Sequence, residues 1–200
     1  MSDNQLRLAV ILGSVRDGRI GPTVANWFVG EAERRDDVLV DLVDLADVPI
    51  GSAAPTMTPP PQVLAALHEL TPLLDAADAF VVVTPEYNRS YPAGLKNIID
   101  WHNTQFHAKP VAFVSYGGVS GGLRAVEHLR AVFAELHAVT TRDTVSFHNV
   151  WEQFDGDGKP KDPRRPAAAA NILLEQVTWW ARALKDARAA SPYRALSTAR

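Results

Sequence analysis

Cysteine is absent from this sequence of 200 residues. Disulfides, thiolate metal sites and a cysteine nucleophile are therefore excluded. The formal net charge is only -3, which gives no electrostatic basis for binding nucleic acid or an anionic membrane. No apolar run approaches the length that spans a bilayer. The start of the chain is polar and acidic, unlike a signal peptide, so we expect a cytoplasmic protein.

Short apolar segments alternate with segments in which apolar residues recur at helical spacing. The expected strands are 8–12, 38–43, 79–84, 111–116 and, more weakly, a strand within 139–147. The expected helices begin near Pro22, cover 63–74 with a kink or break at Pro72, begin again near Pro92, and cover 126–136 and 173–184. Residues 44–61 and 151–166 are expected to be loops.

This alternation predicts the α/β class, with a doubly wound parallel sheet in one domain over residues 1–200. The run 79–84 carries no charge and is typical of a central strand buried on both faces. Asp41 interrupts the run 38–43, which favours an edge strand. Five strands with a ligand edge indicate the flavodoxin-like order 2-1-3-4-5, whose switch point lies between the first and third strands.

The loop after the first strand, 13–21, has the features of an anion site. Its glycines permit close backbone approach, and Ser14, Arg16 and Arg19 supply hydrogen-bond donors. The helix that follows adds free N–H groups and the positive end of its dipole. The loop lacks both the Lys-Ser/Thr pair of nucleotide triphosphatases and the Gly-x-Gly-x-x-Gly of dinucleotide-binding folds. An ordinary turn with two solvated arginines is an equally good interpretation of this loop alone.

Two further loops follow expected strands at the same edge. Pro85-Glu86-Tyr87-Asn88 offers an aromatic face beside free backbone groups, and 115–122 contains four glycines that leave no side chain above a flat ring. The glycine loop alone would be interpreted as a flexible connection. Together, the three loops fit a phosphorylated flat heterocycle.

The segments 13–16, 85–88 followed by 95–101, and 109–111 leading to Gly117-Gly118 resemble the NAD(P)H-dependent FMN reductase family, over roughly residues 8–136. That family has a flavodoxin-like fold and includes quinone, azo-dye and chromate reductases. Many members have Ser and Asn where this chain has Arg19 and Gly21. The resemblance implies that these residues bind the cofactor: Ser14, Arg16, Arg19, Ile20, Gly21, Pro85, Glu86, Tyr87, Asn88, Ser115, Tyr116, Gly117 and Gly118.

The resemblance also implies a reaction: ping-pong hydride transfer from NADPH or NADH to N5 of FMN, then to a quinone, free flavin, azo compound or metal oxyanion. No side chain is expected to be catalytic, because the cofactor carries the chemistry. We therefore expect Tyr87 to position the flavin and Glu86 to anchor neighbouring backbone or Lys96. No metal site is expected, and a homodimer or homotetramer is implied. The alternative is an FMN-binding electron carrier or flavin-responsive interaction protein without its own turnover.

Overall fold

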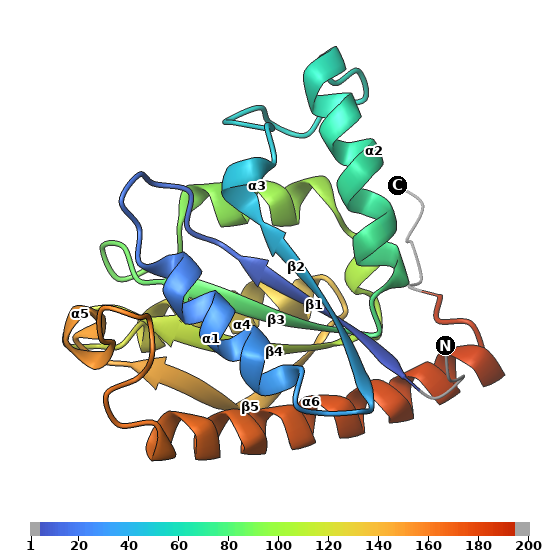
Figure 1. The fold of residues 1–200 in the computed structure, drawn as a ribbon. Helices are drawn as coiled ribbons and strands as arrows, with labels where there is room; N and C mark the ends of the chain where they lie inside the picture. Colours follow the sequence, from blue (N-terminus) through green and yellow to red (C-terminus); the bar gives the residue numbers. More distant parts are fainter. Residues whose placement is uncertain (1–4, 195–200) are drawn as a thin grey trace.

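The computed structural model describes residues 5–194, and its centre is a five-stranded parallel sheet (Figure 1). The strands are β1 (Leu6–Leu12), β2 (Val38–Asp44), β3 (Ala79–Pro85), β4 (Pro110–Tyr116) and β5 (Val139–Phe147). Their order is β2-β1-β3-β4-β5, which confirms the predicted order 2-1-3-4-5 and the doubly wound α/β class. The ends of the expected domain, 1–4 and 195–200, lie outside the described residues.

The apolar runs of the sequence become the middle of this sheet. All seven residues of β3 and all seven of β4 are buried, as expected of strands covered on both faces. The strand β2 lies at an edge, as predicted, and only two of its seven residues are buried. Its Asp41 forms an ion pair of 2.9 Å with Arg7 of the neighbouring strand β1.

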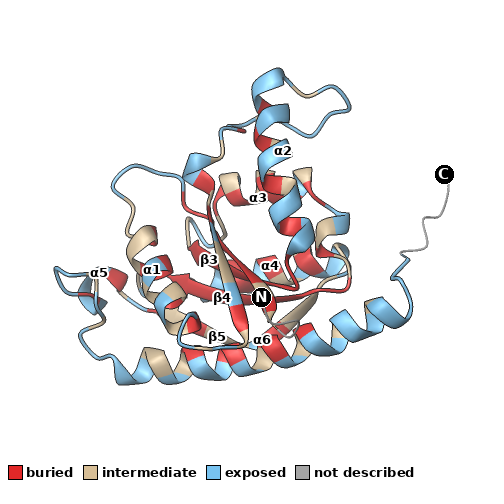
Figure 2. Ribbon diagram, turned by 45° about the vertical axis from the view of Figure 1, so that its right-hand side comes forward, coloured by how far each residue is buried: buried red, intermediate tan, exposed pale blue. Residues whose placement is uncertain are grey.

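Helices cover both faces of the sheet and bury an apolar cluster on each (Figure 2). One face is covered by α1 (Gly21–Ala32) and α6 (Arg164–Ala190). The other face is covered by α2 (Pro61–Ala76), α3 (Ala93–Trp101) and α4 (Leu123–Glu135). Among residues 5–194, no helix is both long enough and apolar enough to cross a membrane.

Three sequence-based boundaries need correction. Helix α2 is not broken at Pro72 but continues to Ala76, because burial of Leu70 and Leu74 on either side compensates for the one lost backbone donor. The segment 151–166 is not all loop: a single turn, α5 (Val150–Gln153), overlaps its start, and α6 already begins at Arg164. The first turns of α6 are rich in alanine, which favours a helix without leaving an apolar stripe to recognise.

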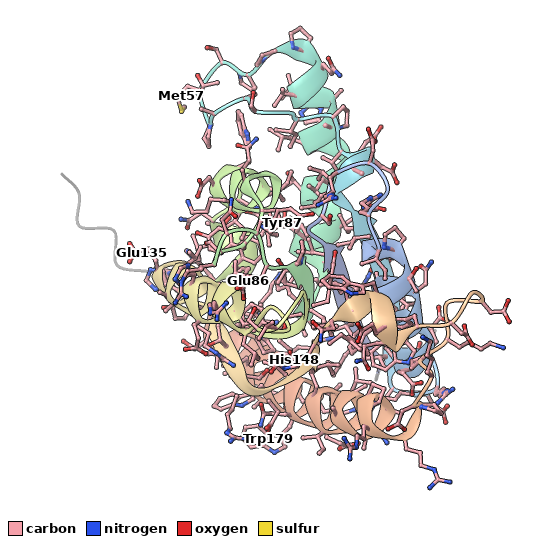
Figure 3. All side chains as sticks on the ribbon, turned by 90° about the vertical axis from the view of Figure 1, so that its left-hand side faces the viewer. Met57, Glu86, Tyr87, Glu135, His148 and Trp179 are labelled. Atoms are coloured by element: carbon pink, nitrogen blue, oxygen red, sulfur yellow. The ribbon has the colours of Figure 1, made fainter. Side chains whose placement is uncertain are left out.

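The 3₁₀ turns η1 (Leu45–Asp47) and η2 (Thr104–Phe106) complete the fold. The loops after β1, β3 and β4 all leave from the carboxyl ends of adjacent parallel strands, and α5 lies beside them (Figure 1). Seen from this edge, Glu86 and Tyr87 lie near the middle of the molecule, whereas Met57 and Trp179 lie at its periphery (Figure 3). The topology therefore brings the three predicted ligand loops together.

Candidate functional site

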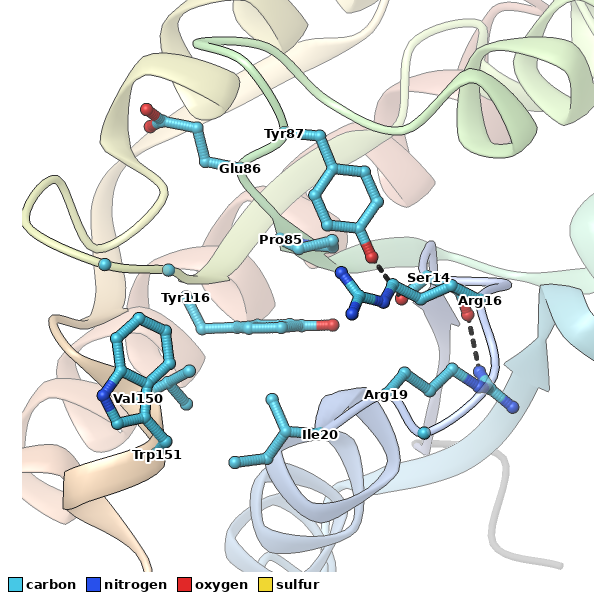
Figure 4. A pocket seen from close by; sticks show the side chains of 13 residues that line it. Ser14, Arg16, Arg19, Ile20, Pro85, Glu86, Tyr87, Tyr116, Val150 and Trp151 are labelled. Carbon is cyan, nitrogen blue, oxygen red and sulfur yellow. Dashed lines mark hydrogen bonds between the residues drawn. The ribbon is translucent and has the colours of Figure 1, made fainter.

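A cavity of about 590 Å³ opens between the three loops (Figure 4). Cavities of roughly 300–1,000 Å³ commonly hold a small molecule or cofactor. Ten of the thirteen predicted site residues line it: Ser14, Arg16, Arg19, Ile20, Pro85, Glu86, Tyr87, Tyr116, Gly117 and Gly118. The other three, Gly21, Asn88 and Ser115, are not part of the lining. Gly18, Val150 and Trp151 complete it.

The loop after β1 forms one end of the cavity. Ser14 is fully buried, and its hydroxyl shares a hydrogen bond of 3.0 Å with the Tyr87 hydroxyl. Within the described part of the chain, no backbone N–H of residues 14–20 donates a hydrogen bond to another residue. The loop that carries these N–H groups leads into the N-terminus of α1, where the helix dipole is positive. This end of the cavity therefore has the properties of an anion site.

The two arginines of this loop have different roles. The Arg19 guanidinium donates to both carboxylate oxygens of Asp44, at 2.7 and 2.8 Å, and to the Ser14 carbonyl at 2.6 Å. Arg19 thus ties the loop to the end of β2. In residues 5–194, Arg16 forms no ion pair; it is exposed, and its guanidinium carbon lies 5.9 Å from the centre of the Tyr87 ring. Arg16 is the cation that remains available to an anion.

The loop after β3 positions Tyr87. The backbone groups of Tyr87 and Ser90 exchange two hydrogen bonds, of 2.8 and 3.0 Å, around a two-residue turn. Both central residues are left-handed, with φ of 48° at Asn88 and 71° at Arg89. The turn carries the exposed Asn88 away from the cavity, while the Tyr87 ring reaches across to Ser14 (Figure 4).

Glu86 is an anchor for neighbouring backbone, as one of the two predicted alternatives has it, and does not pair with Lys96. Its carboxylate accepts hydrogen bonds from the Arg124 backbone N–H (3.1 Å) and guanidinium (2.9 Å), at the start of α4. Lys96 pairs with Asp100 instead. Burial alone would raise the pKa of Glu86, but hydrogen bonds from Ser120 and Arg124 outweigh it and hold the pKa below its ordinary value. Glu86 is therefore ionised at neutral pH and ill suited to donate a proton.

The glycine loop after β4 presents backbone to the cavity. Gly122 has φ of 84°, and a Cβ there would lie 2.8 Å from the Tyr116 nitrogen, so only glycine fits. The buried Ser115 hydroxyl donates to the Gly121 carbonyl at 2.8 Å, which holds the loop closed from below. Ser115 therefore shapes the site without lining it.

Trp151 is a lining residue that the sequence interpretation missed. Backbone hydrogen bonds from Asn149 to Gly118 (2.9 Å) and from Val150 to Gly117 (3.0 Å) dock α5 onto the glycine loop. Trp151 is 63% exposed, and a Cβ at Gly118 would lie 3.6 Å from its ring. The available signal was an aromatic residue four positions after the end of the last strand, at the ligand edge of the sheet.

Residues 6–152 match the family model for NADPH-dependent FMN reductase. The chain belongs to this family. An NAD(P)H-dependent FMN reductase of Schizosaccharomyces pombe is 40% identical over 121 residues, which are 58% of this chain and 60% of that protein. The alignment thus spans less than two thirds of that relative. A quinone reductase of Escherichia coli is 35% identical over 140 residues, 68% of this chain and 73% of its own length.

Solved structures agree with the fold. The flavoenzyme NAD(P)H:(acceptor) oxidoreductase FerB from Paracoccus denitrificans aligns with a TM-score of 0.63 and 23% identity, covering 90% of this chain and 98% of that one. NADPH-dependent FMN reductases are oxidoreductases that use FMN and NAD(P)H. The residues around the cavity suit FMN: unpaired N–H groups and Arg16 at one end, and Pro85, Tyr87 and bare glycine backbone at the other.

Proposed function

We propose that this reductase transfers electrons from NAD(P)H to a small-molecule acceptor through FMN bound in the cavity at the carboxyl edge of the sheet. The acceptor class is a quinone, free flavin, azo compound or metal oxyanion. The observation that carries the proposal is the pairing, in one cavity, of an anion-binding loop with a flat, nearly side-chain-free wall at Gly117 and Gly118.

The side chains of the site bind and position. The N–H groups of residues 14–20 and Arg16 hold the phosphate, and Tyr87, fixed by its hydrogen bond to Ser14, orients the ring system. When bound, FMN supplies the hydride-transfer chemistry. Glu86 holds the start of α4 in place through its hydrogen bonds from Arg124, and it does not transfer a proton. Nicotinamide and acceptor enter in turn beside Trp151, a lining residue that is largely exposed.

Because NAD(P)H and the acceptor occupy the same site one after the other, we expect ping-pong kinetics. Double-reciprocal plots at several acceptor concentrations should be parallel, and intersecting lines would contradict this scheme.

The deciding experiment is a visible absorption spectrum of the purified protein reconstituted with FMN, before and after anaerobic NADPH. A flavin band that bleaches and then returns on adding a quinone supports the reductase. A bound flavin whose absorption band is not bleached by NADPH or by NADH favours an electron carrier. Failure to bind added FMN would refute the assignment of the cavity.

We also propose a homodimer or homotetramer. Trp179 and Ile172 lie seven residues apart on α6 and are 62% and 56% exposed, which is a large apolar area to leave in water. Light scattering on a sizing column tests this, and a monomer at micromolar concentration would refute it.

A further inference from the structure

The turn after Tyr87 places an arginine where the backbone favours glycine. Asn88 and Arg89 are the central residues of the turn that is closed by the hydrogen bonds between Tyr87 and Ser90, and both have positive φ. Turns of this kind prefer Asn-Gly, because glycine adopts a left-handed φ such as the 71° at Arg89 without steric cost. A residue held in an unfavourable conformation beside a ligand cavity indicates a function for its side chain.

Arg89 also has a charge that nothing on the protein neutralises. It is exposed, and within residues 5–194 its guanidinium forms neither an ion pair nor a hydrogen bond. The turn lies against helix α4, because the Ser90 hydroxyl and Nδ1 of His128 are 3.0 Å apart. One helical turn closer to the start of α4, Arg124 is 45% exposed and donates one guanidinium N–H to Glu86 of the cavity lining. Arg89, Arg124 and His128 form the basic rim of the cavity.

The other side of the cavity has the opposite sign of charge. Trp151 lies across the cavity from Tyr87 (Figure 4). The segment that follows it, 152–161, carries three carboxylates and two lysines. On the basic rim, Arg124 balances the charge of Glu86, and Arg89 is left over. Since exposed charges act on one another over about 10 Å in ordinary salt, a doubly charged anion at the cavity mouth is drawn to the basic rim.

NADPH and NADH differ by one such anion, the phosphate on the 2′ position of the adenosine ribose. The cavity itself is taken by FMN in the proposed function, so the adenosine half of the nicotinamide nucleotide lies outside it, on a rim. We propose that Arg89, assisted by Arg124, binds the 2′-phosphate of NADPH and makes the reductase select NADPH over NADH. This inference rests on the proposed function, because it requires a nicotinamide nucleotide at the FMN cavity. A guanidinium presents paired N–H donors that match phosphate oxygens, whereas the 2′-hydroxyl of NADH carries no charge.

The test compares Arg89→Gln with wild type in the steady-state reduction of a quinone, with NADPH or NADH as the donor. Glutamine keeps the Cβ and a polar end but removes the charge. The value of kcat/KM should fall about three- to tenfold for NADPH and less than about twofold for NADH. The loss should lie in KM, because the 2′-phosphate is remote from the reacting atoms and binds equally in the ground and transition states.

Two further variants sharpen this comparison. In Arg89→Gln/Arg124→Gln, the preference for NADPH should be smaller than in Arg89→Gln. The matched control is Arg142→Gln, which also removes one positive charge: Arg142 is on β5, its side chain is 89% exposed, and it does not line the cavity. This control should change kcat/KM for each donor by less than about twofold, because only a charge beside the cavity contacts the 2′-phosphate. A loss equal to that of Arg89→Gln would contradict direct contact.

Equilibrium binding provides a readout that does not depend on turnover. Calorimetric titration of the oxidised, FMN-loaded protein should show tighter binding of NADP⁺ than of NAD⁺. The difference should shrink in Arg89→Gln and in high salt, because exposed ion pairs are screened. Equal use of NADPH and NADH by wild type, or equal losses for both donors in Arg89→Gln, would overturn this inference and leave the reductase intact. A bound flavin that neither donor reduces would instead refute the proposed function, and this inference with it.

Discussion

Substitution of Glu86 separates an anchoring carboxylate from a catalytic one. The Glu86 side chain is 7% exposed and accepts two hydrogen bonds from Arg124 at the start of α4. Glu86→Gln keeps an oxygen that can accept from the Arg124 backbone N–H but removes the charge. Glu86→Ala removes both interactions and leaves the first turn of the helix without its acceptor.

The expected costs follow from these two contacts. The Arg124 side chain is 45% exposed, so the ion pair contributes about 0–1 kcal/mol. Loss of a side-chain acceptor at a helix start costs about 0.5–2 kcal/mol, typically about 1. We therefore expect Glu86→Gln to lower the free energy of unfolding by up to about 1 kcal/mol and Glu86→Ala by about 2 kcal/mol. Urea denaturation at neutral pH measures both, with Glu127→Gln, whose ion pair on α4 is exposed, as the control.

The pH dependence has a defined sign. Because the pKa of Glu86 is lowered in the folded protein, its charge stabilises the fold above the ordinary carboxyl pKa of 4.5. This contribution disappears as the pH falls through the folded-state pKa, so wild type and Glu86→Gln should converge in stability at acid pH. Loss of a general acid would lower kcat by about 10²–10⁴. A loss of that size in Glu86→Gln, with stability unchanged, would refute the anchoring role.

Three further predictions concern residues around the sheet edge and the core. Arg89→Gly should stabilise the protein by about 0.5 kcal/mol in urea denaturation, because relief of its left-handed φ outweighs the added chain entropy; destabilisation would contradict this. Asp78→Asn should destabilise it by about 1–3 kcal/mol in the same assay, since the carboxylate accepts from the Arg7 N–H and Lys185. Trp151→Ala should raise KM for a quinone about two- to tenfold in steady-state assays, and an equal effect of Trp179→Ala would argue against contact.

The sheet was predictable because its signals are local. The strands β1, β3 and β4 are short apolar runs, which end at Gly13, Pro85 and Gly117. Strands buried on both faces must lie in the middle, and a strand interrupted by Asp41 belongs at an edge. These constraints were enough to give the strand order and to bring ten of the predicted site residues around one cavity.

Trp151 escaped prediction for the opposite reason. Its position depends on one helical turn whose backbone N–H groups bond the glycine loop some thirty residues earlier in the chain, at Gly117 and Gly118. A helix of four residues is too short to show a periodic pattern of apolar residues, and the surrounding sequence is polar. The position of Trp151 is set by where β5 ends in the sheet and not by the residues next to Trp151 in the sequence.

Arg19 and Tyr116 show how strand pairing assigns chemistry that composition leaves open. The pairing of β1 with β2 sets Leu12 opposite Asp44, which brings a carboxylate beside the loop that begins at Gly13. The Asp44 carboxylate pairs with the Arg19 guanidinium. Of the two arginines in the loop, Arg16 is therefore the one available to bind an anion. At the end of β4, the same sheet directs a phenol into the space beside Gly21. In the described residues, the loop after β1 therefore offers an anion Arg16 and backbone N–H groups that have no partner, where a P-loop would use a lysine.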